Sequence, residues 1–153
     1  MKTISAAFAL FLSVTINAQH SLEPLWKTDS LLKTPESVLF SGLDKVLYVS
    51  IINGDPVAKD GNGSIGKVGL DGKIINAEWV KGLDAPKGLG LYRNTLYAAD
   101  LNNVAVIDAK KAAVIQKIEV KGSGMLNDIT VDRNGIIYVS DSQDGKIFRI
   151  ENG

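Results

Sequence analysis

The stretch Leu126–Asp141, LNDITVDRNGIIYVSD, decides the fold of this chain. After Leu126 it has a polar pair, Asn127-Asp128, and continues as an apolar run; it then turns at Arg133-Asn134-Gly135 and has a second apolar run that ends in Ser140-Asp141. Short runs of β-branched and aromatic residues on both sides of an Asn-Gly turn are typical of paired antiparallel strands. The stretch therefore predicts a β-hairpin.

The same plan occurs twice upstream. Pro86–Asp100 reads PKGLGLYRNTLYAAD, and Pro35–Ser50 reads PESVLFSGLDKVLYVS. Tyr48, Tyr97 and Tyr138 hold the same place in the three copies, at spacings of 49 and 41 residues. Two more strands are expected after each of the first two copies, and one after the third. Units of four short antiparallel strands that recur every ~40–50 residues predict a β-propeller.

We therefore expect an all-β protein with four-stranded antiparallel blades at roughly 35–81, 86–121 and 126–153, the third blade one strand short. Residues 22–32 are expected to form an outer strand, placed to complete the last blade of the ring. Propellers close with about four to eight blades. Three blades therefore predict half of a six-bladed ring.

Two arrangements would account for a half-ring. The chain is either an N-terminal fragment of a longer protein or a half-propeller that pairs with a second copy of itself. The stop at Asn152-Gly153, a turn pair one strand short of a blade, favours the fragment. An open piece would expose apolar blade faces, and we expect self-association from these faces.

Met1–Ala18 has the plan of a secretory signal peptide. Lys2 precedes an apolar run from Ile4 to Ile16, and the small Ala18 occupies the expected cleavage position. The run is shorter than the ~20 residues needed to span a bilayer, so no membrane span is expected. An apolar core strand or helix is the alternative. Cleavage near Ala18 would leave residues 19–153 as the propeller, exported to the periplasm or secreted.

Composition excludes several classes of function. The formal net charge is zero, so the chain lacks the basic field that attracts nucleic acid or an anionic membrane. Cysteine is absent, which rules out disulfides and thiolate chemistry in this sequence. The single histidine, His20, adjoins the expected cleavage point. Chemistry would therefore rest on carboxylates, amides, hydroxyls, lysine, arginine or a bound metal.

With these motifs, the chain resembles the regucalcin and gluconolactonase superfamily of propellers, with NHL-repeat proteins as close relatives. The resemblance covers Pro35 to the end of the sequence. It implies a divalent metal, calcium in the first instance, at the centre of the ring. Glu36 matches the family's first-blade metal ligand, and Asn127 matches its Asn ligand. Because only one blade separates them, substrate binding is an alternative role for Asn127. The family's acidic residue, both ligand and base, would lie beyond Gly153, so the catalytic base is unknown.

Glu36, Lys87 and Asn127 occupy the same polar position at the start of the three copies. Carboxylate and amide oxygens suit calcium or magnesium. Lys87 would repel a cation or pair with Glu36, and it is expected, with Asp128, to bind substrate. In the alternative interpretation, these side chains line a solvated channel and cap the inner strands.

The fold and these polar positions are compatible with two functions. The first is an exported, metal-dependent hydrolase of a lactone, an ester or a sugar-derived ligand. The second is a non-catalytic, NHL-like propeller that binds a ligand or a protein on its face. The polar segment Asn53–Gly63 is expected to be a loop over the ring face. Asp100 and Asp141 follow matching strands, and each is expected to hold the turn after its strand through side-chain to backbone hydrogen bonds, with ligand contact as the alternative.

Overall fold

The computed structural model describes residues 21–151 of the chain. The expected signal segment, residues 1–18, lies outside this range. Within the range the chain forms strands, turns and loops. A search of the described residues finds no helix long and apolar enough to cross a membrane.

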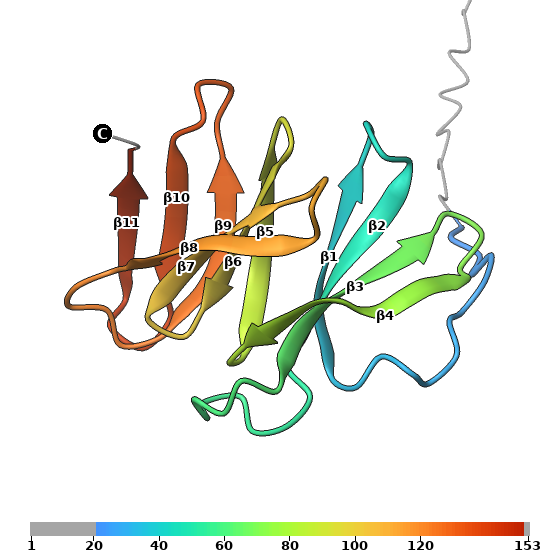
Figure 1. The fold of residues 1–153 in the computed structure, drawn as a ribbon, viewed down its shortest axis with the longest axis horizontal. Coiled ribbons are helices and arrows are strands. Elements are labelled where there is room, and N and C mark those ends of the chain that lie inside the picture. The colour runs from blue at the N-terminus through green and yellow to red at the C-terminus, as the bar shows by residue number, and fades with distance from the viewer. Residues whose placement is uncertain (1–20, 152–153) are drawn as a thin grey trace, which may run out of the picture.

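Eleven strands form three antiparallel sheets in the described range (Figure 1). The first sheet has the order β1 (Pro35–Ser41), β2 (Val46–Ile51), β3 (Gly63–Gly69) and β4 (Ile74–Leu83). The second has the order β5 (Pro86–Tyr92), β6 (Thr95–Asp100), β7 (Asn103–Asp108) and β8 (Ala113–Glu119). The third contains β9 (Leu126–Val131), β10 (Ile137–Asp141) and β11 (Lys146–Ile150), with β10 in the middle.

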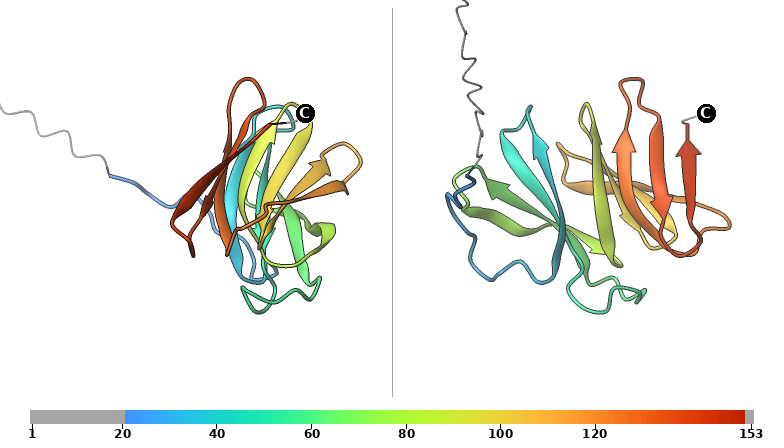
Figure 2. Two further views of the ribbon diagram at one scale, coloured as in Figure 1. Left: turned by 90° about the vertical axis from the view of Figure 1, so that its left-hand side faces the viewer. Right: turned by 180° about the vertical axis from the view of Figure 1, so that it is seen from behind.

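The three sheets stand side by side as blades, and Figures 1 and 2 show the same arrangement from the front and from behind. The first strand of the middle blade, β5, contacts both β1 and β9, so the three inner strands are neighbours. The prediction of a partial propeller with about three four-stranded blades is therefore confirmed, with three strands in the last one. The six-bladed ring stays a prediction.

Apolar alternation along the strands explains how the blades stack. On β6, Leu96 and Ala98 belong to the core shared with the first blade, whereas Tyr97 and Ala99 belong to the core shared with the third. Successive side chains of a strand point to opposite faces of its sheet. The middle blade is therefore buried on both faces.

Residues 22–32 are not a strand in this structure, contrary to the expectation for them. The segment lies against the outer face of the first blade, where the Trp26 Nε1–H donates to the Leu70 carbonyl at 3.0 Å. Leu32 packs on a small core of Val49, Ile51 and Val68. A strand needs a neighbour with which to exchange backbone hydrogen bonds. The expected partner belongs to the last blade of the ring, so that pairing stays a prediction.

Candidate functional site

Each inner strand carries a β-bulge at its start. On β1, Pro35 lies opposite Ile51 and Val38 opposite Val49, so the inner strand has one extra residue between these pairs. The same irregularity occurs between Pro86 and Leu89 on β5 and between Leu126 and Ile129 on β9. Bulges re-aim side chains and are common beside functional sites. The bulged pairs are Glu36-Ser37, Lys87-Gly88 and Asn127-Asp128, which include all four residues predicted for the site.

Serine hydroxyls on the second strands support two of these bulges. Ser50 Oγ accepts a hydrogen bond from the Ser37 N–H at 2.9 Å, and Ser140 Oγ accepts one from the Asp128 N–H at 2.9 Å. A bulge leaves its extra residue outside the strand ladder, so each hydroxyl replaces a lost backbone partner. The sequence reasoning missed both serines. The signal was the Ser that ends LYVS and IYVS, where the middle blade has Ala99.

The bulge of the middle blade contains a glycine, Gly88, which allows it to pack closely against the third blade. A Cβ added to Gly88 would lie 2.6 Å from Asp128 Cα and 2.7 Å from the Asn127 carbonyl oxygen. Both neighbours are backbone atoms, so no side-chain adjustment could make room. The β5 and β9 bulges are therefore in direct contact, which brings Lys87-Gly88 beside Asn127-Asp128.

Electrostatics links the bulges of all three blades. Glu36 is exposed at the start of β1, but partial desolvation of its carboxyl raises its pKa. The positive charge of Lys87 opposes that rise, and the negative charge of Asp128 adds to it. Glu36 therefore lies within electrostatic reach of both Lys87 and Asp128.

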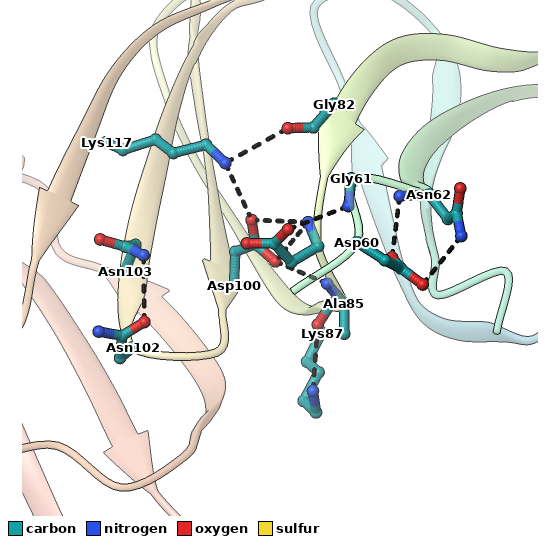
Figure 3. Close-up of polar contacts among 11 residues, drawn as sticks. Asp60, Gly61, Asn62, Gly82, Ala85, Lys87, Asp100, Asn102, Asn103 and Lys117 are labelled. Atoms are coloured by element: carbon teal, nitrogen blue, oxygen red, sulfur yellow. Dashed lines mark hydrogen bonds and ion pairs between the residues drawn. The ribbon is translucent and has the colours of Figure 1, made fainter. Parts of the chain in front are cut away.

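Lys87 is the most buried of the four predicted residues, at 5% exposure. Its Nζ donates to the Ala85 carbonyl at 3.0 Å, as Figure 3 shows, and to the Pro56 carbonyl at 3.0 Å. Burial lowers the pKa of the amine, whereas the charges of Glu36 and Asp100 oppose that shift. The structure thus gives the amine two backbone partners, and the expected contact with substrate stays a prediction.

Two buried carboxylates fix the points where the chain enters the second and third inner strands. Asp100 is completely buried and accepts hydrogen bonds from the N–H groups of Asp84, at 3.0 Å, and Ala85, at 2.8 Å, with Lys117 Nζ at 3.7 Å (Figure 3). Asp141 accepts from the N–H groups of Gly124 and Met125 just before β9. It also accepts from Gln143 and Asp144 in the turn that follows β10. Asp141 holds the turn after its own strand, as expected, whereas Asp100 differs from the expectation because its printed partners lie before β5 and not in the turn that follows β6.

The side-chain oxygens at the bulges are of the kind that binds a hard cation. Glu36 and Asp128 offer carboxylate oxygens and Asn127 an amide oxygen, which are the ligands that calcium prefers. Lys87 adds a positive charge to this region, but its amine is bound to two carbonyls. Among residues 21–151, no three Asp, Glu or His side chains gather closely enough to hold a metal. The assignment of Glu36 and Asn127 as metal ligands therefore stays a prediction, with further ligands expected from other blades.

Comparison with known proteins places the fold. No protein-family model matches the chain, and no curated protein does either. Among solved structures, it is similar to a gluconolactonase from Xanthomonas campestris at 17% identity and TM-score 0.56, over 77% of this chain and 46% of that one. A calcium-binding regucalcin from Agrobacterium tumefaciens matches at 21% identity and TM-score 0.51, over 70% and 38%. A chain of the nidogen–laminin complex matches at 24% identity and TM-score 0.56, over 77% and 44%.

These likenesses agree with the resemblance drawn from the repeats. The chain spans less than half the length of each solved structure that it matches here. It has, over that part, the β-propeller fold that the gluconolactonase and regucalcin structures share.

Proposed function

We propose that this chain supplies one side of the central site of an exported six-bladed propeller that hydrolyses a lactone or an ester with the help of a divalent metal, calcium in the first instance. One observation carries the proposal. Three equivalent bulges, on three neighbouring inner strands, present Glu36, Lys87 and Asn127-Asp128 at the same end of the blades. The names of the similar structures, a gluconolactonase and a calcium-binding regucalcin, support the same reading.

Glu36 would be the principal ligand from this chain, with Asn127 or Asp128 as the second. A divalent cation held there would polarise the carbonyl group of the substrate and lower the pKa of a bound water. Glu36 suits the role because it keeps a carboxylate at an accessible place. The Ser140 hydroxyl bonds the Asp128 N–H and so fixes the backbone that carries the second ligand.

The test uses the full-length protein, with Glu36→Gln as the variant. We expect hydrolysis of a simple lactone to depend on added calcium or manganese and to be lost in Glu36→Gln. Glu78→Gln is the matched control, because Glu78 is exposed on β4 and pairs with Lys81. Activity that survives in Glu36→Gln, or that needs no metal in the wild type, would overturn the proposal.

A second candidate is a non-catalytic propeller that binds its ligand on this face. The observation that favours it is Lys87, whose positive charge stands in the middle of the three equivalent positions. Binding of a ligand after exhaustive chelation, without hydrolysis under any metal condition, would select this candidate over the hydrolase.

A further inference from the structure

Loop 53–62 joins β2 to β3 and lies at the end of the blades where the inner strands begin (Figure 1). The sequence predicted a polar loop over this face. Three separate contacts tie it to the junction between the first and second blades, although it contains two glycines and no strand.

The first contact is the hydrogen bond from Lys87 Nζ to the Pro56 carbonyl, which joins the loop to the start of β5. The second is the bond from the Gly61 N–H to Asp84 Oδ1 at 3.1 Å. The third is steric. A Cβ at Gly63, where the loop enters β3, would collide with the Pro86 ring and the Asp84 carbonyl.

The same loop forms one wall of a cavity of about 250 Å³. Val57 and Lys59 line it from the loop, Leu101 and Asn102 from the β6–β7 turn, and Ser123 to Met125 with Gln143 from the third blade. Met125 lies two residues before Asn127, so the cavity adjoins the bulge of β9. Val57, Leu101 and Met125 form an apolar part of its wall, which suits an alkyl group, whereas Lys59, Asn102, Ser123 and Gln143 make the rest of the wall polar.

We propose that Lys87 is a positioning residue, which holds loop 53–62 as a wall of this cavity, and that the cavity receives the alkyl side chain of the substrate. The second half of this proposal rests on the proposed hydrolysis. Pro56 is adjacent to Val57, so the Lys87 bond fixes the backbone next to the residue that lines the cavity. Pocket sizes for small molecules begin at about 300 Å³, so this cavity suits part of a ligand.

The role of Lys87 in holding loop 53–62 is tested by hydrogen–deuterium exchange of the full-length protein, with Lys87→Met and Asp84→Ala as variants. Lys87→Met keeps the length of the side chain and removes the donors. Asp84→Ala releases the other end of the loop without touching the buried lysine. We expect faster exchange confined to residues 55–62 in both variants, and none in Lys121→Met, an exposed lysine. Unchanged exchange of the loop in both variants would overturn the proposal.

Binding of the substrate's alkyl side chain in the cavity is tested with γ-butyrolactone and γ-nonalactone, which share the reacting ring and differ in an alkyl side chain. We expect the ratio of KM for γ-nonalactone to KM for γ-butyrolactone to rise about three- to tenfold in Lys87→Met and Asp84→Ala, because alkyl contacts are lost. A ratio that stays at the wild-type value in both variants, while the loop exchanges faster, would refute the assignment of the cavity. If the wild type hydrolyses neither lactone, the hydrolase proposal fails, and the exchange data alone decide the role of Lys87.

Discussion

Replacement of Asp100 by alanine tests how the junction between the first two blades is held. The carboxylate is completely buried and accepts hydrogen bonds from two consecutive backbone N–H groups, those of Asp84 and Ala85. Alanine would leave both donors without a protein partner. A buried donor without a partner costs about 1–3 kcal/mol, and Asp84 is only half-buried. We therefore expect Asp100→Ala to lower the free energy of unfolding by about 3 kcal/mol.

Urea unfolding, followed by fluorescence at fixed protein concentration, measures this loss. With an m value of about 1.5 kcal/mol per M, the midpoint should fall by about 2 M. Asp108→Ala is the matched control, because Asp108 also accepts from two backbone N–H groups, those of Lys110 and Lys111, in a turn that water reaches. We expect a clearly smaller shift there. Equal shifts in the two variants, or a loss below about 1 kcal/mol in Asp100→Ala, would show that burial of these donors is not what stabilises the junction.

Three further predictions concern the same face. Gly88→Ala should destabilise the protein by about 1–3 kcal/mol, because a Cβ meets the backbone of the third blade. Its control in thermal unfolding is Gly42→Ala, where the nearest atom lies at 3.7 Å, and equal melting temperatures would refute the close fit. Ser140→Ala should change stability by less than about 0.5 kcal/mol, because the Asp128 N–H that it leaves is exposed to water; a larger drop in the same assay would contradict this. For Asp141, burial would raise the pKa, but four backbone N–H groups outweigh it and hold the pKa below the ordinary value of 3.8. The stabilisation by the Asp141 carboxylate is therefore complete above pH 3.8 and is lost as the pH falls through the lowered pKa. The difference in urea midpoint between the wild type and Asp141→Asn should shrink on acidification. A difference that stays constant would contradict a stabilising role for the charged carboxylate.

The fold could be predicted from the sequence because its signals are local. Asp71-Gly72 and Asn134-Gly135 mark turns, and the glycine of each pair has the positive φ that such turns require. Between the turns, the alternation of apolar residues fixes which face of each blade is buried. Residues 22–32, expected as an outer strand, are not a strand in this structure, and here the local signal was not enough. Apolar residues such as Leu25 and Trp26 favour a strand only where a neighbouring strand offers hydrogen bonds, and no local pattern shows whether one does.

The candidate site was predicted in part. Register within the repeat was enough to select Glu36, Lys87 and Asn127 as equivalent positions. It did not show that each position lies in a bulge, because a bulge is a property of two paired strands. It also did not show that Ser50 and Ser140 support two of the bulges, or that Lys87 reaches a carbonyl of a distant loop.

The sequence by itself determined the strands, the turns and the repeat that orders them into blades, since these depend on residues within a few positions of one another. Only the tertiary structure decided the partners of the buried polar groups. Lys87 bonds Pro56 across 31 residues, and Asp100 bonds Asp84 across 16 residues. Each partner is a backbone group, which carries no signal in the sequence. The physical reason is that a buried charge must find hydrogen bonds wherever packing brings them, and packing is settled only when the blades come together.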